Sequence, residues 1–201
     1  SVVNWWGSST TIVVLPGTCV VPSKAAWREI VGKLSASGKH LTRFDAGGLR
    51  GHCAPDELAV ALAGCPLQEL RLSLPITDEG VFDEGFTPDP ASDEDQAPFR
   101  PSRFLVGSSI RNLALEGTLI SDKSLFALAP ACASLRTLSL ARSWKVSDDG
   151  LDMMTFAAQH ITHLDISNTA ISDVGLATMA KHCPAITVLL VSGTHIGDKG
   201  C

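Results

Sequence analysis

One pattern of about 25 residues recurs along the chain, and this recurrence limits the folds that the chain can adopt. Leu135–Leu140 reads L-R-T-L-S-L and is followed at Val146–Leu151 by V-S-D-D-G-L. Ile161–Ile166 reads I-T-H-L-D-I and is followed at Ile171–Leu176 by I-S-D-V-G-L. A period of roughly 20–50 residues is typical of stacked units, because one short unit cannot bury its apolar face alone. The sequence therefore predicts a solenoid of similar units.

Each unit begins with an apolar strand pattern, L-x-x-L-x-L or a close variant. The patterns are separated by 26, 43, 25, 26 and 25 residues, and they begin at Leu41, Leu67, Ile110, Leu135, Ile161 and Ile186. Stacked units place successive strands side by side. We therefore predict parallel strands, adjacent in this order, at Leu70–Leu72, Leu113–Leu115, Leu138–Leu140, Leu164–Ile166 and Leu189–Val191. The spacing of 43 residues indicates an insertion between the second and third units.

The second half of each unit has the period of an amphipathic helix. Apolar residues recur at positions i, i+3, i+4 and i+7, which lie on one helix face, as Leu58/Ala61/Leu62/Cys65, Leu125/Leu128/Ala129/Cys132 and Leu176/Met179/Ala180/Cys183. The cysteines share one position of the unit. We predict that they are buried, reduced thiols and not a disulfide framework or a metal site, which fits a reducing compartment.

An aspartate recurs where each helix is predicted to begin, namely at Asp78, Asp122, Asp148, Asp173 and Asp198. A carboxylate at a helix N-terminus accepts hydrogen bonds from free backbone amides and interacts favourably with the helix dipole. We therefore predict that these aspartates cap the helices. A metal site or an acid–base site is the alternative explanation for the recurrence.

Residues 1–40 are predicted to form an N-terminal cap and a first helix, ahead of repeats that occupy residues 41–201. Trp5-Trp6 and the β-branched run from Thr10 to Val14 suit an atypical end unit, which covers the first apolar face of a solenoid. An aromatic anchor for a partner or a membrane surface is the alternative for the two tryptophans. Ser23 is the predicted N-cap of a helix, whose apolar face is formed by Ala26, Trp27, Ile30, Val31 and Leu34.

The insertion spans about residues 83–106 and is acidic and rich in proline. It holds six acidic and two basic residues, a charge of 2 − 6 = −4 out of the net −5 of the chain. Its four prolines oppose regular structure. We interpret it as a solvated loop, and its three phenylalanines make a docking loop the alternative.

The last residues are Asp198-Lys199-Gly200-Cys201, where the pattern predicts the start of a further helix. A strand edge and an apolar face that are left uncovered favour aggregation. We therefore expect another chain, or residues beyond Cys201, to cover this end.

Composition and motifs argue against several functional classes. A net charge of −5 lacks the basic footprint of a nucleic-acid-binding protein. No apolar run reaches the roughly 18 residues that a membrane span requires. No P-loop, dinucleotide fingerprint, H-E-x-x-H or nucleophile elbow occurs. His160, His163 and His182-Cys183 make only a weak metal-binding pattern, so we expect no catalytic residue, no cofactor and no metal.

The repeat over roughly residues 41–201 resembles the leucine-rich repeats of the cysteine-containing subclass, which occur in F-box/leucine-rich-repeat proteins. The resemblance implies an α/β solenoid with a parallel concave sheet and outer helices. It also implies non-enzymatic protein binding.

Two functional roles are compatible with that resemblance. The first is an architectural or accessory subunit of a larger assembly, such as a mitochondrial respiratory or ATP-synthase complex. Short repeat proteins of the mitochondrial ATP-synthase coupling factor B and distal membrane arm assembly families are similar. The alternative is the substrate-recognition module of a ubiquitin ligase. We favour a mitochondrial over a cytoplasmic location.

The candidate partner-binding surface consists of the outward positions of the predicted strands and the residues that follow them. Side chains alternate between the two faces of a sheet, so these residues project away from the core. They are small and polar towards the middle of the sheet and apolar at its end, which suits a protein partner. Plain solvation of the strand positions is the alternative. The candidates are Arg71, Asn112, Glu116, Thr137, Ser139, His163, Asp165 and Leu190.

Overall fold

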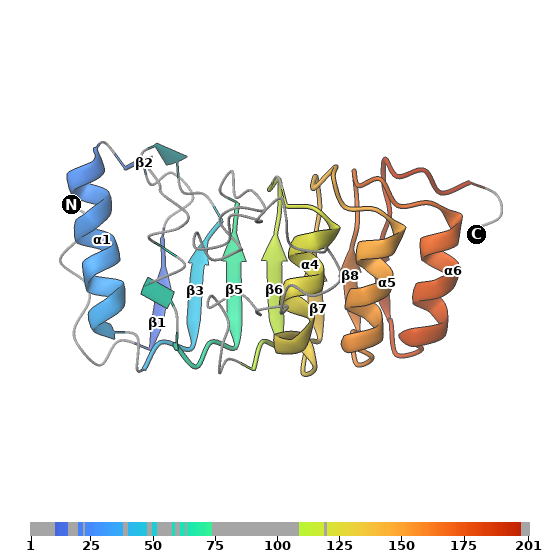
Figure 1. The fold of residues 1–201 in the computed structure, drawn as a ribbon, viewed down its shortest axis with the longest axis horizontal. Coiled ribbons are helices and arrows are strands. Elements are labelled where there is room, and N and C mark those ends of the chain that lie inside the picture. Colours follow the sequence, from blue (N-terminus) through green and yellow to red (C-terminus); the bar gives the residue numbers. More distant parts are fainter. Residues whose placement is uncertain are drawn as a thin grey trace, which may run out of the picture.

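A row of parallel strands backed by a row of helices forms the molecule (Figure 1). The computed structural model describes residues 11–15, 20–21, 23–37, 40–47, 50–51, 58, 61–62, 64–73, 109–118 and 120–197. Within these ranges no helix is long and apolar enough to span a bilayer. The insertion at 83–106, Trp5-Trp6, Asp78 and Asp198 lie outside the described residues.

Seven strands form one sheet in the order β1-β3-β5-β6-β7-β8-β9, and every neighbouring pair is parallel. The strands are β1 (Ile12–Val14), β3 (Arg43–Ala46), β5 (Glu69–Leu72), β6 (Asn112–Leu115), β7 (Thr137–Ser139), β8 (His163–Asp165) and β9 (Val188–Leu190). The predicted order of neighbours is confirmed. Strands β5 to β9 each begin one residue before the predicted position. A separate parallel pair consists of β2 (Val20–Val21) and β4 (Arg50–Gly51).

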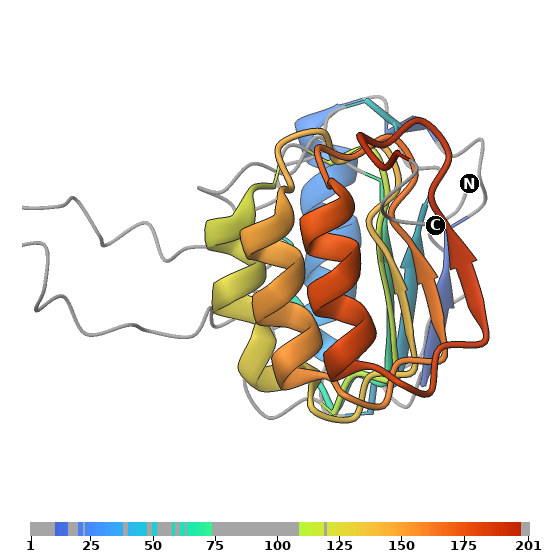
Figure 2. The same cartoon turned by 90° about the vertical axis from the view of Figure 1, so that its right-hand side faces the viewer.

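The helices are α1 (Lys24–Ser37), α4 (Asp122–Leu128), α5 (Asp148–Ala157) and α6 (Asp173–His182), and a 3-10 turn, η3 (Ala129–Cys132), continues α4. Figure 2 shows that α4, α5 and α6 lie in one layer against the same face of the sheet. In α1 the amide of Ala26 donates to the hydroxyl of Ser23 at 3.3 Å, which confirms the predicted N-cap. Trp27, Ile30 and Leu34 are buried, as the helical spacing predicts.

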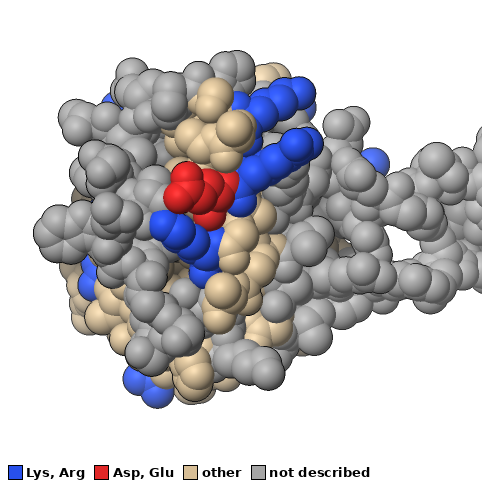
Figure 3. Space-filling view, turned by 90° about the vertical axis from the view of Figure 1, so that its left-hand side faces the viewer, with Lys and Arg blue, Asp and Glu red and all other residues tan. Residues whose placement is uncertain are grey.

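The end of the molecule where α1 lies carries charges of both signs. Figure 3 looks onto this end and shows acidic side chains between basic ones. The helix contributes one acidic and three basic residues. Glu29 pairs with Lys33, one turn further on, at 3.4 Å. An exposed pair of this kind contributes only about 0.3–0.5 kcal/mol, so it does not position the helix.

Inward side chains of successive strands form a straight row through the core. Leu70, Leu113, Leu138 and Leu164 are partners in register, and each has at most 1% of its surface exposed. Burial of each leucine contributes about 1.5–3 kcal/mol relative to exposure. Leu189 of β9 continues the row but is 37% exposed, since none of the described helices covers the last unit.

Asp122, Asp148 and Asp173 do not cap their own helices, which corrects the prediction for the three recurring aspartates that the structure describes. Ser121, Ser147 and Ser172 occupy the N-cap positions, and the hydroxyls of Ser121 and Ser172 accept backbone amides of the first turn. Asp122 and Asp148 instead reach the N-cap serine of the next unit. Stacking of the units places each of these serines within hydrogen-bond distance of the carboxylate in the preceding unit.

Each of these aspartates makes a pair of hydrogen bonds to the next unit. Asp148 accepts the amide of Ser172 at 2.8 Å and its hydroxyl at 2.5 Å. Asp122 binds Ser147 in the same way, at 2.8 and 2.7 Å. Asp173 continues the series by accepting the amide of Gly197 at 2.7 Å. We call this series the aspartate ladder.

The ladder also explains the glycine in the I-[ST]-D-x-G-L pattern. A methyl group on Gly150 would overlap the carboxylate of Asp122, and one on Gly175 would overlap that of Asp148. Both glycines lie in helices, at positions where their own backbone conformation does not require glycine. The residue type is therefore set by the neighbouring unit.

A row of buried hydroxyl groups anchors the turns that follow the strands. Thr118, Ser143 and Thr169 have at most 4% of their surfaces exposed, and each donates to a strand-end carbonyl oxygen, of Leu115 or Ile166, at 2.6–3.0 Å. The residue immediately before each has a positive φ, namely Gly117 (66°), Arg142 (64°) and Asn168 (55°). Glycine and asparagine are the residues that most readily adopt a positive φ, so Arg142 is the exception among these three turns.

Cys65, Cys132 and Cys183 are free and buried, as the shared position predicts. Burial raises the pKa of all three thiols, and that of Cys132 to about 12. For Cys183 a backbone hydrogen bond at Ile161 lowers the pKa, but burial is the larger effect. These thiols pack as small apolar groups and stay protonated at neutral pH.

Candidate functional site: the outward face of the sheet

The candidate surface is the face of the sheet that points away from the helices, which we call the sheet face. Figure 2 shows the end strands β1 and β9 further from the helix layer than the middle strands, so this face is concave along the solenoid. Strand alternation puts two outward rows on it. The first row is Ile12, Arg43, Glu69, Asn112, Thr137, His163 and Val188, and the second is Val14, Asp45, Arg71, Ala114, Ser139, Asp165 and Leu190.

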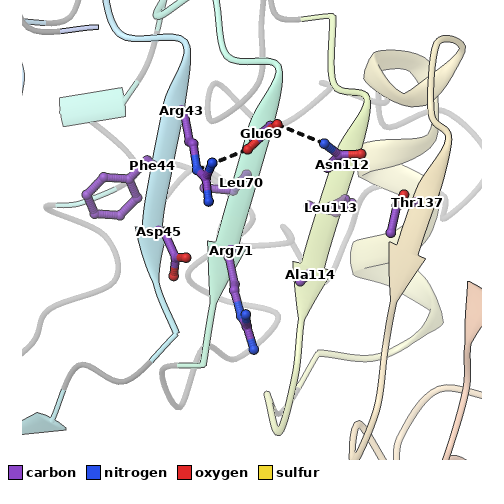
Figure 4. A pocket seen from close by; sticks show the side chains of 10 residues that line it. All are labelled: Arg43, Phe44, Asp45, Glu69, Leu70, Arg71, Asn112, Leu113, Ala114 and Thr137. Atoms are coloured by element: carbon purple, nitrogen blue, oxygen red, sulfur yellow. Dashed lines mark hydrogen bonds and ion pairs between the residues drawn. The ribbon is translucent and has the colours of Figure 1, made fainter. Parts of the chain in front are cut away.

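A shallow hollow of about 140 Å³ lies over four neighbouring strands, β3, β5, β6 and β7 (Figure 4). Long charged side chains stand on β3 and β5, whereas β6 and β7 contribute the short side chains of Ala114 and Thr137. This difference in length produces the hollow. Its lining residues are Arg43, Phe44, Asp45, Glu69, Leu70, Arg71, Asn112, Leu113, Ala114 and Thr137.

Glu69 is the centre of the first polar network at the hollow. Its Oε2 lies 3.0 Å from Nε of Arg43, and its Oε1 accepts Nδ2 of Asn112 at 3.0 Å (Figure 4). The side chains of Arg43 and Glu69 remain 45% and 38% exposed. A pair this exposed contributes at most about 1 kcal/mol to stability. Its main effect is to hold three side chains from three strands in fixed positions.

Glu116 is the centre of the second network, at the carboxyl ends of the strands. Its carboxylate lies 3.3 Å from Nη2 of Arg71 and accepts the hydroxyl of Ser139 at 3.2 Å. Its backbone carbonyl accepts the hydroxyl of Ser73 at 3.0 Å. Arg71 is nevertheless 52% exposed, so part of its guanidinium is free to bind a partner.

Two aspartates in the second row are held by the main chain. Asp45 accepts the amide of Gly47 at 3.0 Å, and Asp165 accepts that of Ser167 at 3.0 Å. Within the described residues neither carboxylate forms an ion pair. Gly47 also leaves room for Arg71, because a methyl group there would lie 2.8 Å from Nε of that side chain. The two carboxylates therefore present free negative charge on either side of the small residues in the row.

Apolar side chains close the sheet face at both ends. Ile12 and Val14 of β1 are 55% and 52% exposed, and Val188 and Leu190 of β9 are 40% and 51% exposed. The surface thus has a charged, hydrogen-bonded centre between two apolar margins. Protein interfaces more often have an apolar core and a polar rim, so the order on this face is the reverse, with exposed apolar area on both sides of a charged centre.

The structure gathers most of the predicted site residues into one region. Arg71, Asn112 and Thr137 line the hollow, and Glu116 and Ser139 bond to one another beside it. The remaining three predicted residues continue the face on β8 and β9, namely His163, Asp165 and Leu190. Whether a partner contacts these residues stays a prediction.

The predicted set omits three charged residues of the hollow, Arg43, Asp45 and Glu69. All three occupy outward strand positions, so strand alternation in the sequence could have identified them. Only the register shows that Glu69 lies beside Asn112 and that Asp45 lies beside Arg71.

The histidines of the weak metal-binding pattern do not converge. His163 lies on the sheet face, where its Nδ1 is 2.9 Å from the hydroxyl of Thr162. His182 lies on α6, where its Nδ1 is 3.3 Å from a carboxylate oxygen of Asp152 in α5. Among the described residues, no group of three or more His, Cys, Asp or Glu is arranged to hold a metal ion.

Comparison with known proteins gives a family match to part of the chain. A family model described as a leucine-rich repeat matches residues 157–180, which run from the end of α5 through β8 into α6. Among solved structures, the chain is similar to one described as the crystal structure of the Rad7 and Elc1 complex in yeast.

That structural likeness is distant. The TM-score is 0.37 and the sequence identity is 13%, over 87% of this chain and 55% of that chain. The chain thus spans about half the length of the protein chain that it matches. A likeness at this level carries no functional assignment. The matched repeat, the recurring units and the all-parallel sheet together show an α/β solenoid fold of the leucine-rich-repeat type.

Proposed function

We propose that the chain is a non-enzymatic protein-binding module and that the sheet face seats its partner. The observation that carries the proposal is the hollow between the two networks of Glu69 and Glu116, with apolar margins on both sides. Its hydrogen bonds and ion pairs already restrict these side chains in part, which lowers the side-chain entropy that binding removes. A partner surface with both charge signs at its centre and apolar residues at its rim would complement it.

Arg71 is the residue we expect to contribute most to this binding. It is half exposed and lies at the hollow between the carboxylate of Glu116 and the turn at Gly47. Arginine is enriched among residues that dominate interface energies, because its planar fork makes several directed hydrogen bonds. A partner carboxylate would bind the part of the Arg71 guanidinium that is exposed beside Glu116.

Two biological roles are compatible with this surface. As an architectural subunit of a larger assembly, such as a mitochondrial respiratory or ATP-synthase complex, the chain would hold a permanent partner. As the substrate-recognition module of a ubiquitin ligase, it would hold its partner transiently. Protein binding by the repeat fold supports both roles. The identity and stoichiometry of the proteins that co-purify with the tagged chain from its native cell distinguish them.

The test of the proposed surface is a charge reversal with a matched control. After the partner has been identified, Arg71→Glu should weaken its measured affinity by about tenfold or more, the range of an interface residue worth above 1.4 kcal/mol. Lys181→Glu makes the same charge change on exposed α6, on the helix side, and should leave the affinity unchanged. Equal affinities of the two variants would place the partner elsewhere on the molecule.

A further inference from the structure

The turn between β7 and α5 is longer than its counterparts in the neighbouring units. The distance from the residue of positive φ to the N-cap position is four residues from Gly117 to Ser121 and from Asn168 to Ser172. From Arg142 to Ser147 it is five residues. One additional residue is therefore inserted into a turn whose two ends occupy the same places in the stack.

Both ends of the longer turn are anchored in the core, so the additional length projects outward. Ser143 is fully buried and donates to the carbonyl of Leu115 at 2.9 Å, while Val146 is fully buried further on. The amide of Val146 donates to the carbonyl of Ser143 at 3.0 Å, which closes the turn. Trp144, between these anchors, is 61% exposed. We call residues 142–145 the Trp144 turn.

Two basic residues belong to the same turn as the exposed indole. Nζ of Lys145 lies 5.5 Å from the centre of the Trp144 ring, within the range of a cation–π contact. Arg142 adopts a φ of 64°, where the other units have glycine or asparagine. In the described part of the chain, neither cation forms an ion pair with an acidic side chain. Among the described residues, no hydrogen bond or ion pair joins the side chains of Arg142, Trp144 and Lys145 to a neighbouring unit, and the positive φ of Arg142 is a strained conformation for a residue other than glycine.

We propose that the Trp144 turn is a second binding surface, which takes an acidic peptide segment of a protein partner. The indole offers a large apolar platform, and the two free cations offer charge-assisted hydrogen bonds to carboxylates. The local positive charge orients an acidic segment on this turn. The chain as a whole has a net charge of −5, which disfavours non-specific binding of anions elsewhere. Single-stranded nucleic acid has similar chemistry, but it requires a longer basic track than one turn provides.

The surface is separate from the hollow on the sheet face. The Trp144 turn follows the carboxyl end of β7, where the amide of Arg142 donates to the carbonyl of Ser167 at 2.8 Å. None of its residues lines the hollow. A partner of the sheet face and an acidic segment can therefore be tested independently, with different variants.

The experiment measures the affinity of fluorescein-labelled acidic peptides, each with one aromatic residue, by fluorescence anisotropy on the full chain. Lysine-for-glutamate versions of the same peptides provide the reversed-charge probe. We expect the acidic peptides to bind more tightly than the reversed ones and less tightly as the salt concentration rises. Trp144→Ala should weaken binding about tenfold, as for an aromatic interface residue worth about 1.4 kcal/mol.

Arg142→Gly is the variant that separates binding from folding. Glycine accepts the positive φ at this position, so the melting temperature should stay equal or rise while the peptide affinity falls severalfold. Phe156→Ala removes an aromatic side chain of similar exposure, 63%, from α5 and should leave peptide affinity unchanged. Arg71→Glu should also leave it unchanged, which separates this proposal from that for the sheet face.

Three results would overturn the proposal. The first is equal affinity of the acidic and reversed-charge peptides. The second is full affinity in Trp144→Ala. The third is tighter binding of a single-stranded oligonucleotide than of any acidic peptide, which would assign the turn to nucleic acid.

Discussion

Asp148 stabilises the helix of the following unit through two hydrogen bonds to Ser172. Hydrogen bonds to a charged group contribute about 1.5–3 kcal/mol, and their loss leaves the amide of Ser172 without its partner. We predict that Asp148→Ala lowers the free energy of unfolding by about 2–3 kcal/mol. Asp149→Ala, one residue on and exposed, keeps the ladder and should cost less than about 1 kcal/mol through the dipole alone. Urea denaturation measures both, and equal losses would contradict the ladder.

Gly175 and Gly32 form a matched pair of helical glycines. A methyl group on Gly175 would overlap the carboxylate of Asp148, whereas none of the neighbouring atoms lies within 4 Å of one on Gly32. Alanine in a free helical site stabilises by about 0.5–1 kcal/mol. We therefore predict that Gly32→Ala raises the midpoint of thermal unfolding and that Gly175→Ala lowers it. A rise in both would mean that Asp148 can move away without loss.

Cys132 makes stability depend on pH in alkaline solution. Burial raises the pKa of its thiol from 9.0 to about 12, so between these values the unfolded chain loses a proton that the folded chain keeps. Proton loss favours the unfolded state, and the free energy of unfolding should fall by up to about 1.4 kcal/mol per pH unit above pH 9. Below pH 9 the thiol is protonated in both states, so its contribution to the free energy of unfolding is fully present. Cys132→Ala should show a shallower decline, because it removes the titrating thiol. Alanine fits this site, since Ala158, seven residues after Leu151 as Cys132 is after Leu125, is fully buried at the equivalent position of the next unit. An unchanged slope would show that the thiol is accessible.

At the scale of the element, the strands depend on the units on both sides. Leu164 of β8 is 1% exposed, whereas Leu189, its partner in β9, is 37% exposed at the end of the described stack. We predict that Leu164→Ala lowers the free energy of unfolding by about 2–5 kcal/mol, through lost burial and a residual cavity. Leu189→Ala should lower the free energy of unfolding by clearly less. Denaturant titration of the two variants compares them, and equal costs would mean that the last strand is covered in solution.

At the scale of the whole molecule, β5 and β6 pair directly although the insertion separates them in the sequence. Loop-closure entropy changes by only about 0.6 kcal/mol for each doubling of loop length. We therefore predict that a short Gly/Ser linker in place of residues 84–103 preserves the circular-dichroism spectrum and the unfolding midpoint. A large loss of either would make the insertion part of the folded core. Weaker partner binding with an intact fold would support the docking alternative for the insertion.

The sequence alone determined the stacking of units, the parallel order of the strands, the inward leucines and the buried cysteines. These features are predictable because each depends on the periodicity of apolar residues within one unit and on its recurrence. Strand alternation also predicted which side of the sheet would carry Arg71, Asn112 and Thr137. The strands begin one residue earlier than predicted, and in β7, β8 and β9 the last predicted residue, such as Leu140 or Ile166, lies just beyond the strand.

Only the tertiary structure decided which residues contact one another between units. Asp148 was predicted to cap its own helix, but it accepts its hydrogen bonds from Ser172 in the next unit. The hollow depends on the lateral register of β3, β5 and β6, and the exposure of Trp144 depends on anchors at both ends of its turn. These contacts are set by the spacing between stacked units. A pattern within one unit carries no information about that spacing, because the contacting residues are about 25 positions apart in the sequence.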